Sequence, residues 1–159
     1  MSEIPQSEDL RNIGRTAQII AGALIAGVLM FAVVAFIVGK GEGPDRMPVV
    51  SVIAAAIAGI NLVLRFVVPA IVVSSQTKSV VGTAEPKLTQ LLAGIYQTKM
   101  IVGMAVLEGA AFLNLVAYIV EKQVWSYGVV ACLLTVMIIS FPSQTQFENW
   151  AEDIKRNLK

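Results

Sequence analysis

The chain of 159 residues contains no histidine and a single cysteine, Cys132. Without histidine, the familiar Ser-His-Asp and Cys-His arrangements of nucleophilic catalysis cannot form. Zinc, haem and iron–sulfur sites lack the histidines and paired thiolates that usually hold them. One thiol cannot form a disulfide within the chain, so the redox compartment is left open. We therefore expect no enzyme activity, no metal site and no cofactor.

Charged residues are also scarce. They make up 14% of the chain and hydrophobic residues 56%, whereas a typical soluble domain has about 25% charged residues. The formal net charge of +1 gives no reason to expect a nucleic-acid partner. This composition predicts an integral membrane protein whose main partner is the lipid bilayer. We expect a single membrane domain over residues 1–159, with no separate soluble domain.

Four apolar segments are separated by polar connections, and we expect each of them to cross the membrane as a helix. The segments are Ala17–Val38, Val49–Val73, Met100–Val120 and Trp125–Phe141. The glycines and prolines of residues 39–48 predict a turn, and Pro142 closes the last and shortest segment. The predicted fold is all-α, a bundle of four transmembrane helices.

Short interfacial helices are expected at both ends of this bundle. At the N-terminus, Leu10, Ile13 and Ala17 fall at helical spacing. At the C-terminus, residues 143–158 form an amphipathic pattern in which Ser143 and Gln146 match a capping box. The C-terminal helix could lie in the membrane interface, or it could dock onto a soluble partner.

Lysine and arginine residues predict the orientation of the chain. Four crossings place both termini and the second connection on one side of the membrane, which then carries Arg11, Arg15, Lys78, Lys87, Lys99, Lys155, Arg156 and Lys159. The opposite side carries only Lys40, Arg46 and Lys122. Because positive residues accumulate on the cytoplasmic side, both termini are predicted to be cytoplasmic, in a bacterial inner (plasma) membrane.

Two opposite charges lie inside the predicted spans. Arg65 and Glu108 should both sit about 12 Å from the cytoplasmic edge, at ~1.5 Å of rise per residue. We expect them to pair as a clamp between adjacent helices, because pairing reduces the cost of burying a charge. Alternatively, Arg65 extends to the headgroups and leaves Glu108 alone and protonated, or Glu108 binds a proton or a cation.

Further polar residues share these helices. Asn61 lies one turn before Arg65, and Gln97 lies nearly on the helical face of Glu108. Asn114 lies on a neighbouring stripe of the same segment. Their simplest role is interhelical hydrogen bonding, and the alternative is to assist Glu108 in an ion site. Small residues at four-residue spacing in the first segment indicate close helix packing, and we expect a homo-oligomer or a larger membrane complex.

One stretch, Gln97–Gly109, has the sequence QTKMIVGMAVLEG. It resembles the carboxylate-bearing outer helix of subunit c, the proteolipid of rotary ATP synthases, in its Gln-Thr lead and in Met100, Ile101, Gly103, Ala105, Leu107, Glu108 and Gly109. The resemblance implies that Glu108 takes up and releases a coupling proton or sodium ion.

These observations support two hypotheses about function. In the first, the chain is a small non-catalytic subunit or scaffold of a membrane complex, with Arg65 and Glu108 as a buried pair. In the second, it is an ion-handling subunit similar to subunit c, with Glu108 as the binding carboxylate.

Overall fold

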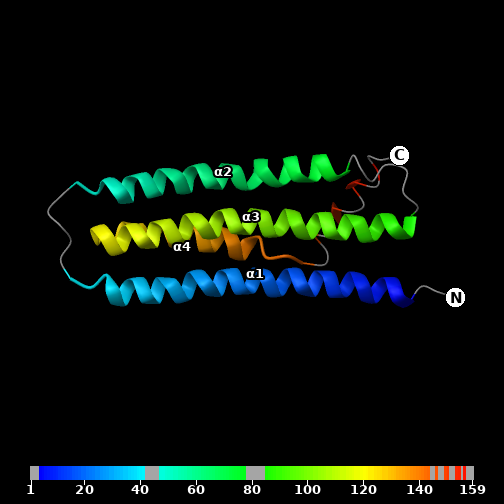
Figure 1. Ribbon diagram of the computed structural model, residues 1–159, viewed down its shortest axis with the longest axis horizontal. Coiled ribbons are helices and arrows are strands. Elements are labelled where there is room, and N and C mark those ends of the chain that lie inside the picture. Colours follow the sequence, from blue (N-terminus) through cyan, green and yellow to red (C-terminus); the bar gives the residue numbers. More distant parts are fainter. Residues whose placement is uncertain are drawn as a thin grey trace.

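The chain forms four α-helices in a computed structural model (Figure 1). They are α1 (Ile4–Val38), α2 (Val49–Thr77), α3 (Glu85–Glu121) and α4 (Trp125–Ile139). The structure describes residues 4–41, 47–77, 85–143, 146, 149–150, 153–154 and 156, without the side chains of residues 4–13, 77, 85–87 and 89. Within these ranges there is no β-strand.

Three of the helices are long and apolar enough to cross a membrane. Their candidate spans are Gly14–Val38, Val49–Gln76 and Gln90–Glu121. The fourth helix, α4, has only 15 residues, and a helix needs about 20 apolar residues to cross the hydrocarbon core unaided. The all-helical fold is therefore confirmed with three candidate spans, and a fourth full-length spanning helix is not confirmed.

The helix α3 lies at the centre of the arrangement. It packs against α1, α2 and α4, and α1 and α2 lie on its two sides (Figure 1). The colours of Figure 1 show that α1 and α3 run in the same direction, while α2 and α4 run in the opposite one. Most of the interior is consequently built around α3.

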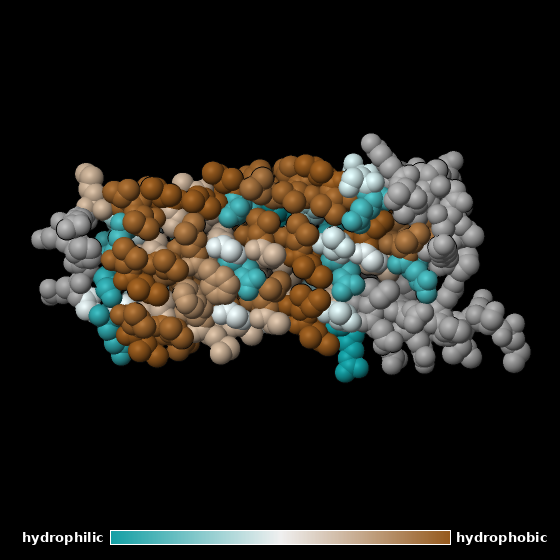
Figure 2. Space-filling model, in the orientation of Figure 1, coloured by the Kyte–Doolittle hydropathy of each residue, from teal (hydrophilic) through white to brown (hydrophobic). Residues whose placement is uncertain are grey.

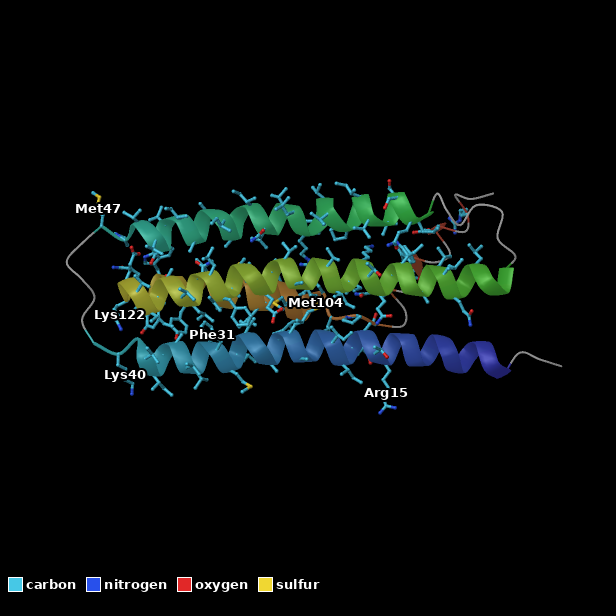
Figure 3. The ribbon with its side chains drawn as sticks, in the orientation of Figure 1. Arg15, Phe31, Lys40, Met47, Met104 and Lys122 are labelled. Atoms are coloured by element: carbon cyan, nitrogen blue, oxygen red, sulfur yellow. The ribbon has the colours of Figure 1, made fainter. Side chains whose placement is uncertain are left out.

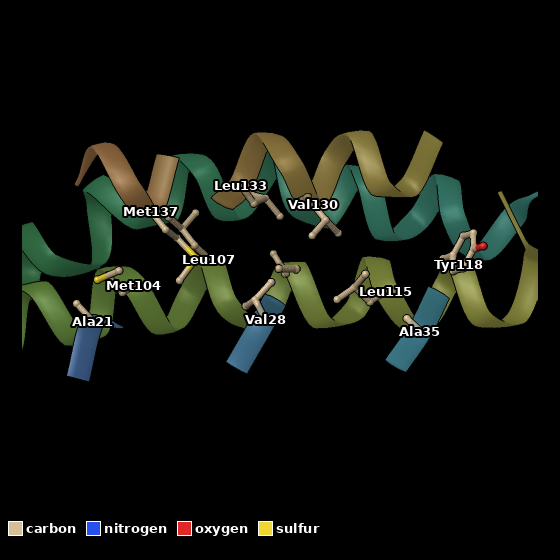
Figure 4. Packing of buried hydrophobic residues seen from close by; sticks show 13 residues of the cluster. Ala21, Val28, Ala35, Met104, Leu107, Leu115, Tyr118, Val130, Leu133 and Met137 are labelled. Carbon is tan, nitrogen blue, oxygen red and sulfur yellow. The ribbon is translucent and has the colours of Figure 1, made fainter. Parts of the chain in front are cut away.

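The core is a cluster of apolar side chains between α1, α3 and α4 (Figure 4). On α1 the buried residues Ala21, Val28 and Ala35 recur every seven residues, so that a narrow stripe of small side chains faces α3. The larger members come from the other two helices: Met104, Leu107, Leu115 and Tyr118 on α3, and Val130, Leu133 and Met137 on α4. The small stripe on α1 allows the long helices to lie close together.

Positively charged residues mark both ends of the bundle. Figure 3 shows Lys40 and Lys122 at one end and Arg15 toward the other, and we call these the Lys40 end and the Arg15 end. The helical rise from Arg15 to Lys40 is about 38 Å, enough to cover the ~30 Å hydrocarbon core. Hydrophobic residues dominate the surface between the ends (Figure 2).

The N-terminal segment differs from the separate interfacial helix that the sequence predicts, and the predicted C-terminal helix over residues 143–158 lies partly outside the described residues. At the N-terminus, the backbone from Ile4 onward belongs to α1 without interruption. At the C-terminus, the backbone amide of Gln146 donates to Ser143 Oγ at 3.3 Å, as the capping pattern predicts. Beyond it, Trp150 and Ile154 pack against the buried residues Leu92 and Ile95 of α3. The apolar side of this segment is thus covered, at least in part, by the chain's own α3.

Candidate functional site

Arg65 binds the C-terminal end of α4. Its Nη1 donates to the carbonyl oxygen of Val136 at 3.5 Å, and its Nη2 donates to Ser140 Oγ. The Ser140 hydroxyl in turn donates to the same Val136 carbonyl at 2.6 Å. The Val136 carbonyl also accepts the backbone N–H of Ser140 at 3.2 Å, so Arg65 adds to a carbonyl that already has a backbone partner. The C-terminal end of a helix carries partial negative charge, so a guanidinium is a favourable neighbour there.

A second long polar side chain reaches the chain just after α4. Gln18 on α1 donates from Nε2 to the carbonyl oxygen of Pro142 at 3.2 Å, and Pro142 is buried. Non-helical backbone at membrane depth is tolerated where protein groups satisfy it. Arg65 and Gln18 therefore tie the end of the short α4 to both flanking helices, α2 and α1.

Glu108 faces a different helix. Its Oε1 lies 3.5 Å from the position that a Cβ would occupy at Gly27 on α1, next to the ring of Phe112. The side chain is half-buried. A Cβ at this distance would make ordinary van der Waals contact, so the Glu108 carboxyl packs directly against α1.

The predicted pair of Arg65 and Glu108 is not formed. Among the residues that the structure describes, no ion pair joins these two side chains, because Arg65 turns from α2 toward α4 while Glu108 turns from α3 toward α1. The two residues do lie at similar depth, since Arg65 is adjacent to Gly103, about one and a half turns from Glu108. Two side chains at equal depth on neighbouring helices can therefore point in different directions.

Asn114 joins two helices. It is fully buried, and its Nδ2 donates to the carbonyl oxygens of Ala54 on α2 at 3.1 Å and of Ala110 on α3 at 2.9 Å. Asn61 and Gln97 are each half-buried. Among the described residues, no hydrogen bond links Asn61, Gln97 or Asn114 to Glu108. The polar residues singled out in the sequence are therefore not gathered into one site.

Sequence reasoning missed Glu121. This carboxylate ends α3 and is 8% exposed. Its Oε1 accepts the backbone N–H of Val50 at 2.8 Å, and its Oε2 accepts that of Ser51 at 2.7 Å. The first turn of α2 contains no acid of its own. Glu121 therefore supplies, from another helix, the negative charge that a helix N-terminus favours.

The next residue, Lys122, supplies a positive charge to the C-terminal end of α1. It has a φ of 58°, and its Nζ donates to the carbonyl oxygen of Val38 at 3.2 Å. The acid Glu121 thus lies at the N-terminus of α2, and the base Lys122 lies at the C-terminus of α1, as the helix dipoles favour. The clue in the sequence was an acid and a base at the end of α3, while the first turn of α2 contains no acid and the last turn of α1 contains no base.

Taken together, the polar contacts define a class of protein: an all-helical chain with three helices able to cross a membrane, held together by side chains that satisfy helix ends. The described residues contain no group of three or more His, Cys, Asp or Glu that could hold a metal ion. Comparisons with protein-family models, curated proteins and solved structures gave no match to the chain.

Proposed function

We propose that this protein is a small non-catalytic subunit of a membrane assembly, and that copies of it associate through the outer face of α4. In this proposal α4 and the residues after it complete a fourth crossing, so that both termini lie in the cytoplasm of a bacterial cell. The excess of lysine and arginine in the termini and in the second connection of the sequence supports this orientation.

The observation that carries the proposal is the outer face of α4. In the middle of the helix its exposed residues are Gly128, Ala131, Cys132 and Thr135, all of them small, and bulky exposed residues occur only toward its ends, at Trp125, Ile138 and Ile139. The exposed residues of α1 and α2, in contrast, are mostly bulky and apolar, for example Met30, Val63 and Phe66. Small residues allow helix backbones to approach closely within the bilayer, where lipid-facing positions usually carry larger side chains.

The polar residues inside the spans support a structural role rather than chemistry. Arg65 and Gln18 hold the end of α4, and Asn114 joins α3 to α2. Each contact joins two different segments of the chain. A subunit whose buried polar groups serve its own architecture fits a scaffold better than a catalyst or a carrier.

The cysteine of α4 provides the test. Cys132 is exposed and is the only cysteine in the chain, so oxidation with copper phenanthroline in the native membrane should link two copies through α4. A matched control combines Cys132→Ala with Val63→Cys, which moves the thiol to an exposed bulky face of α2. We expect a disulfide-linked dimer for the wild type and much less for the control. A monomer for the wild type, or equal dimer for both, would refute association through α4.

A second candidate function is ion handling at Glu108. The observation that favours it is that, within the described part of the chain, neither Arg65 nor another cation neutralises this carboxyl inside the α3 span. In this alternative Glu108 takes up a proton or a sodium ion, as the resemblance of Gln97–Gly109 to subunit c implies.

Carbodiimide labelling distinguishes the two functions. The reagent modifies protonated carboxyls within apolar surroundings, so an ion-handling Glu108 should be labelled quickly, with labelling that declines at high pH or with added sodium. Mass spectrometry of the wild type and of Glu108→Gln locates the modification. Labelling that is slow and insensitive to both pH and sodium would exclude the ion-handling function.

A further inference from the structure

A cavity of about 820 Å³ opens near the Arg15 end of the bundle. Its walls come from α2, α3, the end of α4 and the C-terminal segment. Most of the lining is apolar, including Phe66, Pro69, Met104 and Ile139. The volume lies within the range of about 300–1,000 Å³ that is typical of small-molecule sites.

Two cations line this apolar cavity, Arg65 and Lys99. The hydrogen-bond acceptors of Arg65, Val136 O and Ser140 Oγ, are both uncharged, so its positive charge is not neutralised by them. The Lys99 ammonium lies 5.5 Å from the centroid of the Trp150 ring, which is also a neutral partner. No carboxylate occurs among the described residues that line the cavity. Partly buried cations in apolar surroundings favour an anionic occupant.

The depth of the two cations matches the boundary of a bilayer. Lys99 is about 33 Å along α3 from Glu121, so it lies at the far edge of a ~30 Å hydrocarbon core. Arg65 lies deeper, beside Gly103, which is one turn further along α3 than Lys99. The anionic group found at this boundary of a bilayer is the lipid phosphate. Lys99 would approach it from the side of the headgroups, and Arg65 would approach it from the side of the hydrocarbon core.

We propose that this cavity binds one anionic phospholipid, with its phosphate between Lys99 and Arg65. Basic pockets between transmembrane helices are suited to such headgroups. Two rim residues, Phe66 and Ile139, are 70% and 74% exposed. The acyl chains can therefore leave the cavity over an apolar rim and join the surrounding lipid. The phosphate site uses Lys99 and Arg65, and it uses neither Glu108 nor the small exposed residues of α4. A failure of lipid binding is therefore distinguishable from a failure of ion handling or of self-association, although the rim residue Ile139 lies one turn after Thr135 on the outer face of α4.

Tryptophan quenching measures this binding in the full chain. The sequence has two tryptophans, and Trp125→Phe leaves Trp150 in the cavity wall as the only emitter. The protein is reconstituted into phosphatidylcholine bilayers that contain increasing fractions of phosphatidylglycerol, with bromine on the acyl chains of one lipid at a time. We expect phosphatidylglycerol to associate at least about fivefold more strongly than phosphatidylcholine, the preference that one cation near an anionic lipid supplies.

The control variants separate the cavity from general surface charge. Lys99→Gln should lower the preference for phosphatidylglycerol over phosphatidylcholine about fivefold, because it removes one such cation. Lys99→Arg should retain the preference, because it retains the charge. The matched control is Lys40→Gln at the opposite end, because Lys40 also lies over an aromatic ring, that of Phe36, at 5.8 Å. Far-UV circular dichroism shows whether each variant keeps its helices.

Three results would overturn the proposal. Equal quenching by the two lipids in the wild type would show that the cavity does not select anionic lipid. An equal loss in Lys40→Gln and Lys99→Gln would assign the preference to overall charge. Relief of quenching by excess inorganic phosphate would show that the cations bind free phosphate rather than a lipid headgroup.

Discussion

The guanidinium of Arg65 donates to the carbonyl oxygen of Val136, so a cation on α2 holds the C-terminal end of α4. Together with the contact of Gln18 to Pro142, this contact joins the end of the 15-residue α4 to two much longer helices. The end of α4 is bonded to protein groups rather than left to lipid, which cannot satisfy backbone carbonyls. The arginine thus acts as a structural cap at the C-terminal end of α4.

Loss of this cap should weaken the whole fold. Arg65→Gln leaves the Val136 carbonyl and the Ser140 hydroxyl without a charged donor, which should lower the free energy of unfolding by about 1–3 kcal/mol. Arg65→Lys should be milder because it retains the charge but loses the second donor group. The measurement is a denaturant titration in mixed micelles followed by circular dichroism. Arg15→Gln, at an exposed position, serves as the control and should change little. Equal stability of the Arg65→Gln variant and the wild type would contradict the capping role.

The contact of Glu121 with the start of α2 gives a second prediction. In Glu121→Gln the side chain keeps one good acceptor for two N–H groups and loses its charge. We expect destabilisation of about 1–2 kcal/mol, since capping contributes up to this amount. Hydrogen exchange should rise first at the amides of Val50 and Ser51, which donate to this carboxylate. Unchanged exchange at these two amides would show that Glu121 does not cap α2.

Two glycines, one within α1 and one just after its C-terminal end, should respond oppositely to alanine. At Gly39 an added Cβ would overlap the ring of Tyr118, which is itself packed against Tyr127 with ring centroids 4.6 Å apart. Gly39→Ala should therefore cost about 1–3 kcal/mol, as overpacking usually does. At Gly22 an added Cβ would meet nothing within 4 Å. Gly22→Ala should instead stabilise the helix by about 0.5–1 kcal/mol. Thermal unfolding in detergent compares the two variants, and a stabilised Gly39→Ala would contradict the close contact between Gly39 and Tyr118.

The buried Asn114 should make a modest contribution. Asn114→Ala removes the hydrogen bond to Ala54 O, and interhelical bonds of this kind contribute about 0.6 kcal/mol on average, with a maximum near 1.7. Asn61→Ala, at a half-buried position on the partner helix, is the matched control. The same mixed-micelle titration measures both. A larger loss for Asn61→Ala than for Asn114→Ala would mean that the wrong asparagine has been assigned to the α2–α3 contact.

Much of the fold was predictable because hydrophobic length is a strong signal. Three apolar segments predicted helices that the structure contains, although α2 continues to Thr77 and α3 begins as early as Glu85. The polar residues that flank the apolar segments continue the helices, because they contain no residue that ends a helix before the next turn. The fourth segment was harder: Trp125–Phe141 reads as one apolar run, but the helix ends at Ile139, three residues before Pro142.

The polar contacts were less predictable because they depend on direction as well as depth. Counting residues correctly placed Arg65 and Glu108 at similar levels, but it could not show that one faces α4 and the other α1. The caps by Glu121 and Lys122 join residues about 70 to 84 positions apart, which local patterns do not encode. The side chains that cap a helix end lie close to it in space but can lie far from it in the sequence.

A double-mutant cycle tests the central claim that Arg65 serves α4 and not Glu108. The free energy of unfolding is measured for Arg65→Gln, Ser140→Ala and Glu108→Gln, and for the double variants that combine Arg65→Gln with each of the others. We expect Arg65 and Ser140 to couple by about 0.5–3 kcal/mol, as contacting residues do, and Arg65 and Glu108 to be additive within about 0.5 kcal/mol. Strong coupling between Arg65 and Glu108, with none between Arg65 and Ser140, would restore the predicted ion pair and contradict the role of Arg65 as the cap of α4.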